Sequence, residues 1–228
     1  MKAVLVAALL VPAGLVLAGC TTAGTPTPAT GAAALPAGRS VLLFRPVLAA
    51  QSPTTPTSQA GGVPRALEPS TAPQQQAIEA ERKTRQDPAL ANPADHQPLV
   101  SAFRCPDEDP LAGQDDPALP LLTCDRKTGE RFVLGPAALG NDDIARATAR
   151  PDENSGGFVV EVEFTPGGAE AWGRLTAESV GQRIGLVLNT SVLSAPSVNE
   201  PILGGTAIIS GQFDRSEAEE LAARLGGR

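Results

Sequence analysis

Apolar and polar residues alternate most regularly at residues 158–164, whose sequence is FVVEVEF. The even-numbered positions are all apolar, whereas Glu161 and Glu163 fall on the opposite face. A period of two is the spacing that a β-strand imposes on its two faces. The segment is therefore predicted to be a half-buried strand with one face towards a core and the other towards solvent.

Two segments repeat their apolar residues at the helical period instead. The first begins at Pro166, where proline suits the first turn of a helix, and Trp172 lies on its apolar face. We expect Trp172 to anchor a core rather than to form a ligand platform. The second follows Asp214, which makes a capping-box pair with Glu217, and it ends at Gly226.

Shorter apolar runs predict further strands, at residues 41–48, 131–134, 183–188, 192–194 and 206–213. Pro46 would place the first of these at a sheet edge or near the end of the strand, because proline cannot donate to a ladder. Gly211 indicates a bulge in the last one. Asn141 is expected to cap a short helix that runs to about Arg150.

The order of these elements predicts an α+β fold. A small antiparallel or mixed sheet would be covered by helices on one face, with a regular core at about 126–228. The Pro-rich stretch at 49–100 is predicted to be a long, largely disordered insertion with one short, solvated helix at 73–86. Together, residues 41–228 are interpreted as one domain.

The N-terminus predicts export and a lipid anchor. Lys2 precedes an apolar stretch that ends in Leu-Ala-Gly-Cys, so residues 1–19 are typical of a lipoprotein signal peptide and Cys20 of the acylated first residue. An ordinary signal peptide or an uncleaved anchor is the alternative. Residues 20–40, rich in Thr, Ala, Pro and Gly, would form a flexible tether. The protein is therefore expected at the extracytoplasmic face of the cell membrane.

Export also bears on the two remaining cysteines. Cys105 and Cys124 lie 19 positions apart, and outside the cytoplasm such a pair favours a disulfide. Two free thiols remain an alternative. A metal site is disfavoured because it would need more ligands than these cysteines and the single histidine, His96.

The charge of the chain argues against a nucleic-acid partner. The formal net charge is −7 with a pI near 4.8, and the chain has one Trp, no Tyr and six Phe. A nucleic-acid interface needs clustered positive charge, and an aromatic stacking platform needs more aromatic residues than these.

No sequence motif predicts catalysis or a cofactor. The chain has no Gly-rich phosphate loop, no G-x-S-x-G and no H-E-x-x-H, and His96 is expected on the surface. The acidic residues at 107–116 do not follow the EF-hand spacing, so a solvated loop is favoured over a Ca²⁺ site. For Glu161 and Glu163 a solvated strand face is favoured over a catalytic carboxylate pair. We therefore expect no enzyme, no cofactor and no metal.

The chain resembles a known family, specifically from about residue 100 onward and most specifically from Arg183. The order of its segments, Val192-Leu193-Ser194-Ala195-Pro196, then Glu200-Pro201-Ile202, then residues 208–213, is similar to that of SecD, a protein-export membrane protein. The resemblance is to the head of the first large extracytoplasmic domain of SecD. It extends over about residues 41–228, and the Pro/Gln-rich insertion and two-cysteine loop resemble the actinobacterial form.

The resemblance implies a role but not the whole activity of SecD. SecD uses proton flow through its membrane part, and this sequence holds no membrane helices for such coupling. What is implied is the role of the head, which is contact with emerging polypeptide or with Sec translocation components. The alternative hypothesis is an envelope lipoprotein that keeps the fold and binds an unrelated partner.

Overall fold

A computed structural model of the chain describes residues 41–53, 71–153 and 156–226. Cys20 and the rest of the expected signal peptide and tether lie outside these ranges. Within them the strands are β1 (Leu42–Gln51), β2 (Leu121–Cys124), β3 (Arg131–Leu134), β4 (Ile144–Pro151), β5 (Phe158–Phe164), β6 (Ile184–Leu188), β7 (Ser191–Ser194) and β8 (Thr206–Phe213). The helices are α1 (Ala72–Arg85), α2 (Pro93–Ala102), α3 (Pro166–Glu178) and α4 (Arg215–Leu225), with 3-10 turns at Pro88–Ala91 and Asn141–Asp143.

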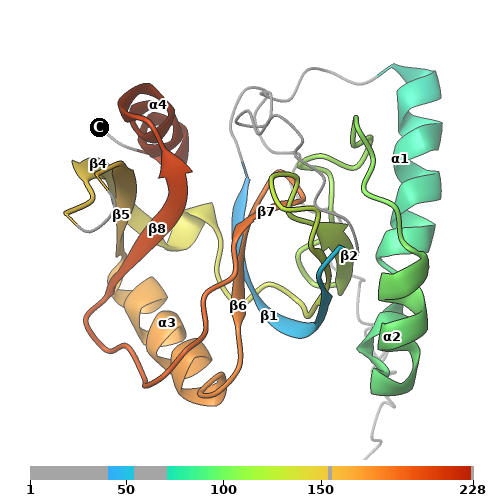
Figure 1. Cartoon of the computed structure of the whole chain (residues 1–228), viewed down its shortest axis with the longest axis horizontal. Helices are drawn as coiled ribbons and strands as arrows, with labels where there is room; N and C mark the ends of the chain where they lie inside the picture. Colours follow the sequence, from blue (N-terminus) through green and yellow to red (C-terminus); the bar gives the residue numbers. More distant parts are fainter. Residues whose placement is uncertain (1–40, 54–70, 154–155, 227–228) are drawn as a thin grey trace, which may run out of the picture. The chain divides into compact units, whose positions relative to one another are not determined.

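The strands form two antiparallel sheets, which confirms the α+β class (Figure 1). One sheet has five strands in the order β2-β3-β1-β6-β7, and the other has three in the order β4-β5-β8. The five-stranded sheet curls, so that β2 approaches β7 and the hydroxyl of Thr123 donates to the carbonyl of Thr190. No helix in the described ranges is both long and apolar enough to span a bilayer.

The main core lies between the three-stranded sheet, the five-stranded sheet and the helices α3 and α4. The predicted alternation of β5 is confirmed, because Val160, Val162 and Phe164 are buried in this core. Trp172 of α3 is also buried, as predicted. The centroid of its ring lies 5.4 Å from the ring centroids of Phe44 and Phe164, which are themselves 5.4 Å apart. This aromatic cluster joins both sheets to α3.

The capping-box prediction for the last helix is confirmed. Asp214 accepts a hydrogen bond from the Glu217 backbone N–H at 2.8 Å, and Glu217 accepts one from the Asp214 N–H at 3.0 Å. The bond from the Glu217 N–H, with one from the Ser216 hydroxyl, lowers the pKa of Asp214, because both favour the charged carboxylate. Gly226 ends the helix in the left-handed region, with φ of 108°.

The first strand is central and not at an edge, contrary to the expectation from Pro46. Residues 42–46 of β1 pair with β6, and residues 47–51 pair with β3. Pro46 therefore lies where the strand changes its main partner, next to an irregularity in the β1–β3 register. A proline is tolerated at such a junction because it interrupts neither ladder in its middle.

The predicted helix at 141–150 is wrong beyond its first turn. Asn141–Asp143 form a 3-10 turn, and the chain then continues as β4, paired along β5. The residues of β4 alternate Ala with Arg or Thr, which is a strand period. Pairing with β5 overrides the helical propensity of the alanines.

The insertion contains more regular structure than the sequence indicated. Besides α1, residues 88–102 form a 3-10 turn and the helix α2, and these pack against β1 and β3. The helix α2 contains Pro98 and few apolar residues, so its sequence shows no clear helical period. His96 lies on this helix and is buried, with Nε2 2.8 Å from the carbonyl of Leu90, so the expectation of a surface histidine is wrong.

We predict that Phe44→Ala lowers the free energy of unfolding by about 3–5 kcal/mol, because it removes the ring that links the two sheets. Trp172 is the only tryptophan, so urea unfolding can be followed by its fluorescence. Leu203→Ala is the matched control, because that side chain is 81% exposed. It should change stability by less than about 0.5 kcal/mol. An equal effect of the two substitutions would contradict the assigned core.

Candidate functional site

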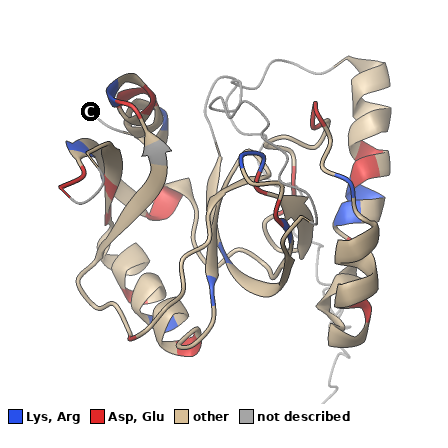
Figure 2. Cartoon of the chain, in the orientation of Figure 1, with Lys and Arg blue, Asp and Glu red and all other residues tan. Residues whose placement is uncertain are grey.

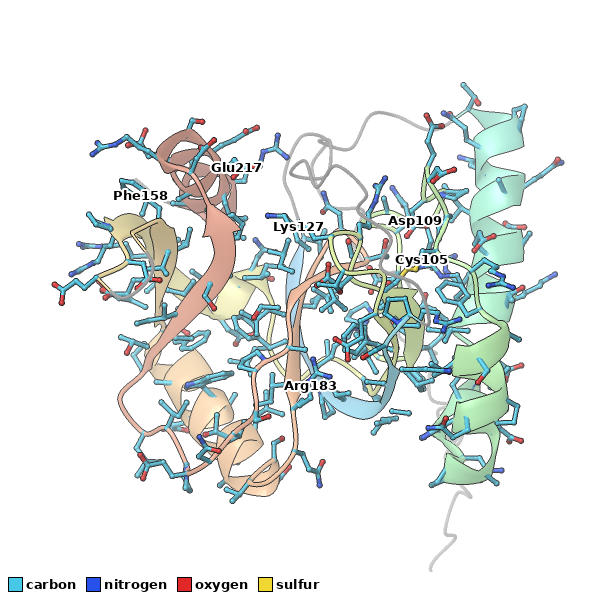
Figure 3. All side chains as sticks on the ribbon, viewed as in Figure 1. Cys105, Asp109, Lys127, Phe158, Arg183 and Glu217 are labelled. Atoms are coloured by element: carbon cyan, nitrogen blue, oxygen red, sulfur yellow. A yellow bond between two sulfur atoms is a disulfide. The ribbon has the colours of Figure 1, made fainter. Side chains whose placement is uncertain are left out.

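The two cysteines predicted to pair are joined in the structure. Cys105 and Cys124 form a disulfide with their Cα atoms 6.0 Å apart (Figure 3). Cys105 follows α2 and Cys124 ends β2, so the bond ties the helical insertion to the five-stranded sheet.

The acidic loop at 107–116 is solvated only in part. Asp107, Glu108 and Asp116 are exposed, as predicted. The Asp115 side chain is buried and contacts Arg45 at 2.7 Å, and the half-buried Asp109 contacts Arg85 at 2.6 Å. Both arginine side chains are themselves buried. A buried charge is expensive unless it is paired, so these two carboxylates serve the fold and are not free to bind a cation.

The two terminal nitrogens of the Arg45 guanidinium are hydrogen-bonded, whereas its Nε has no partner among the described residues. The guanidinium donates to Asp115 Oδ2 at 2.7 Å and to the carbonyls of Leu119 and Gly135 at 2.7 and 2.9 Å. Burial is the largest influence on both charged groups, lowering the pKa of Arg45 and raising that of Asp115. The attraction between them offsets part of each shift.

A polar cavity of about 520 Å³ lies beside the disulfide. Its walls include Cys124, Arg126 and the loop at 106–109, and Asp109 and Arg85 both line it. Asp109 also accepts a hydrogen bond from the hydroxyl of Thr190 at 2.6 Å. Its acceptor groups are thus engaged, and no described set of three or more His, Cys, Asp and Glu side chains is placed to hold a metal.

The carboxylates of β5 lie on its outer face, opposite the core. Glu161 forms an ion pair with Arg150 of β4 at 2.8 Å, and Glu163 lies opposite Arg146 in the β4–β5 register. This arrangement is that of a strand face with cross-strand charge pairs. It places no third group beside them to act as an acid or base partner.

The segment before and within β8 exposes large apolar side chains. Leu203 is 81% exposed and Ile208 is 62% exposed, and Ile202 is 40% exposed. Exposed apolar residues that occur singly are ordinary, but three within seven positions are a candidate contact surface. We call residues 202–210 the apolar edge segment.

The start of the apolar edge segment is held against α3. The N–H of Ile202 donates to the hydroxyl oxygen of Thr176 at 3.0 Å, and that hydroxyl donates to the carbonyl of Trp172 at 2.9 Å. A Cβ atom at Gly173 would lie 3.4 Å from Leu203, so the absence of a side chain there lets the loop lie close to the helix. The aromatic cluster thus positions α3, and α3 in turn positions the loop that leads into β8.

Sequence reasoning did not single out the apolar edge segment, although one signal was present. Ile208 and Ile209 are consecutive in a strand, and consecutive side chains point to opposite faces. Only Ile209 can therefore face the core, where it is fully buried. The second isoleucine had to be exposed or covered by something outside the sheet.

Part of the chain matches a family of known proteins. Residues 120–227 match the family model described as SecDF, P1 head subdomain. The chain is 38% identical over 124 residues to the protein translocase subunit SecD of Mycobacterium tuberculosis strain CDC 1551 / Oshkosh, which is 53% of this chain and 22% of that protein. It is 39% identical over 105 residues to SecD of Rickettsia bellii, covering 46% of this chain and 20% of the relative.

A search of solved structures also finds SecDF. A structure described as "Structure and function of a membrane component SecDF that enhances protein export" is matched with a TM-score of 0.44 and 25% identity, over 83% of this chain and 63% of that one. The chain spans about a fifth of the length of the curated SecD relatives named above.

We predict that Arg45→Met lowers the free energy of unfolding by about 3–5 kcal/mol, because it leaves Asp115 buried without its partner. Adding Asp115→Leu to this variant should recover part of the loss by removing the uncompensated charge. Urea titration of the two single variants and the double variant gives the coupling between the residues. Additive losses would show that the pair is not coupled.

Proposed function

We propose that this chain is a binding module that assists Sec-dependent protein export, because residues 120–227 match the SecDF P1 head subdomain model. Its ligand would be emerging polypeptide, or a component of the Sec translocation machinery. The observation that carries the proposal is the family match, which includes the whole apolar edge segment.

The relatives support this class of function without supplying their full activity. They are named protein translocase subunits, and the matched part is a subdomain of a much longer protein. The activity of a full-length translocase subunit is therefore not assigned to this chain. What a head subdomain can contribute by itself is contact with another chain.

The chemistry of the described residues also favours binding over catalysis. The buried carboxylates are paired with arginines, and the histidine contacts a backbone carbonyl. The exposed apolar side chains of Leu203 and Ile208 offer the kind of surface that an unfolded, partly apolar polypeptide can contact. We accordingly propose a module that acts by contact and carries no cofactor.

We further propose that Cys20 anchors the protein to the outer face of the cell membrane. The supporting observation is the Leu-Ala-Gly-Cys sequence at the end of an apolar segment. Two acyl chains give stable attachment where one would be marginal. Residues 20–40 would then act as the tether, and the two-cysteine loop and insertion would follow the actinobacterial form.

Crosslinking in cells tests the export role. The full chain, expressed in its own host, should crosslink to secreted precursors, to SecD and SecF or to the translocon channel. Deletion of the protein should slow the appearance of secreted proteins. Recovery of unrelated envelope proteins alone, with normal secretion after deletion, would overturn the export role and favour a lipoprotein that serves another partner.

Substitution of Cys20 tests the anchor. Cys20→Ser removes the thiol that would be acylated, so the protein should shift from the membrane fraction to the soluble fraction. Thr21→Ser alters the neighbouring residue and should leave the distribution unchanged. Fractionation followed by mass spectrometry of the N-terminal peptide is the measurement. Unchanged membrane attachment of the Cys20→Ser protein would contradict a lipid anchor at this residue.

A further inference from the structure

A groove of about 340 Å³ lies where the start of β1 meets the 3-10 turn at Asn141–Asp143. Its lining includes Val41 and Leu43 and the residues 137–143. Val41 and Leu43 belong to the face of β1 opposite Phe44, so the groove is separate from the main core. We call it the acidic groove, because three carboxylates are also among its lining residues.

The floor of the acidic groove is apolar. Val41, Leu43 and Leu139 are all buried, whereas Pro117 and Ala138 in the same lining are exposed. The groove therefore combines a buried apolar floor with an opening to solvent. A hollow of this size and character can accept a few side chains of a short extended segment.

The carboxylates of the acidic groove are not balanced by basic residues in its lining. Asp115 is neutralised by its ion pair with Arg45, but Asp142 and Asp143 remain. Asp142 is exposed and forms no ion pair with any described residue. The opening of the groove thus carries net negative charge above an apolar floor.

Other acidic residues of the described chain are compensated. Acidic and basic residues are interspersed on α1 and α4, where they form ion pairs four positions apart (Figure 2). The next basic residue along the chain from Asp142 is Arg146, which lies opposite Glu163 in the β4–β5 register. The excess negative charge at the acidic groove is therefore a local feature of this surface.

The turn that carries Asp142 is fixed on both sides. Asn141 Oδ1 accepts a hydrogen bond from the Leu42 N–H at 2.8 Å, and Asp143 Oδ2 accepts one from the Gly140 N–H at 2.8 Å. The carbonyl of Asp143 accepts a further bond from the Thr165 N–H at 2.7 Å, at the start of α3. A site held in this way loses little conformational freedom when it binds a ligand.

The side-chain amide of Asn141 supplies an independent observation. Its orientation is set because Oδ1 is the acceptor for Leu42. Its Nδ2 is buried and has no hydrogen-bond partner among the described residues. Buried polar groups are almost always paired, so this donor lacks an acceptor. Asn141 lines the acidic groove, where a backbone carbonyl of a bound peptide would be such an acceptor.

We propose that the acidic groove binds an extended polypeptide segment in which an apolar residue lies next to a lysine or arginine. The inference rests on the proposed function and names the site and the sequence feature that it selects. The apolar side chain occupies the floor at Leu43 and Leu139, and the cationic side chain pairs with Asp142.

Charge complementarity selects this occupant. An acidic or phosphorylated segment would be repelled by Asp142 and Asp143, which have no basic neighbour in the lining. A second copy of the chain is disfavoured as well, because each copy has a net charge of −7. We therefore expect one protein molecule to bind one basic segment.

The test measures peptide binding to the purified full chain by fluorescence anisotropy. The probe is a labelled ten-residue peptide with two Leu-Lys pairs among serine and glycine residues. Asp142→Asn should weaken binding by about fivefold, and Asp142→Lys by about tenfold or more, because they remove or reverse the charge that attracts the lysine. A peptide with glutamate in place of each lysine should not bind.

The matched control is Glu178→Gln, which changes the net charge as Asp142→Asn does. Glu178 is exposed at the end of α3 and is not among the residues that line the acidic groove. This variant should bind the peptide as the unaltered protein does. Trp172 fluorescence during urea unfolding verifies that each variant is folded.

A second variant tests the groove without altering its carboxylates. Ala138→Arg places a basic side chain at an exposed position of the lining and retains the backbone bond from the Ala138 N–H to the Phe44 carbonyl. The added arginine should compete with the lysine of the peptide and weaken binding by about tenfold. This variant decides the question if Asp142→Lys does not fold.

Four results would overturn the inference. They are peptide affinity unchanged in the Asp142→Lys and Ala138→Arg proteins, an equal loss in the Glu178→Gln control, equal binding of the lysine and glutamate peptides, or a peptide-free dimer that Asp142→Lys dissociates. If secreted precursors crosslink equally to the unaltered and Asp142→Lys proteins in cells, the acidic groove is wrong while the proposed function stands. If no Sec component or precursor crosslinks to the unaltered protein, the proposed function itself fails.

Discussion

The described structure depends on the neutralisation of one buried positive charge. Arg45 lies in the middle of the central strand β1 and is fully buried, so its guanidinium must find all its partners inside the protein. Its two terminal nitrogens do so through Asp115 and two backbone carbonyls, which come from segments 70 or more positions away in the chain. Because desolvation of an unpaired charge costs several kcal/mol, the sheet can form only when the acidic loop has closed over it. The same loop places Asp109 against Arg85 and so draws α1 onto the sheet.

The opposite face of β1 packs against the smaller sheet and α3. Phe44 meets Trp172 and Phe164, so the strand that holds the insertion through Arg45 also holds the smaller sheet through an apolar contact. Trp172 and Thr176 in turn position the loop that leads into β8. The apolar edge segment therefore begins on the buried face of α3.

The family match includes the turn that carries the carboxylates of the acidic groove. The matched region begins next to β2 and ends after α4, so it includes Asp142 and Asp143 but not the helices α1 and α2. Those helices, with the disulfide, cover the far side of the five-stranded sheet.

The sequence by itself determined the features that depend on local periodicity and capping, such as the alternation of β5, the apolar face of α3, and the capping box and glycine stop of α4. It misjudged β4, α2, His96 and the burial of Asp115, because long-range partners decide each of these. Alanine-rich β4 is a strand because it pairs with β5, and the Asp115 side chain is buried because it forms an ion pair with Arg45. The division of the strands into two sheets could not be foreseen either. Alternation shows which side chain faces outwards, but only long-range pairing decides which strands lie side by side.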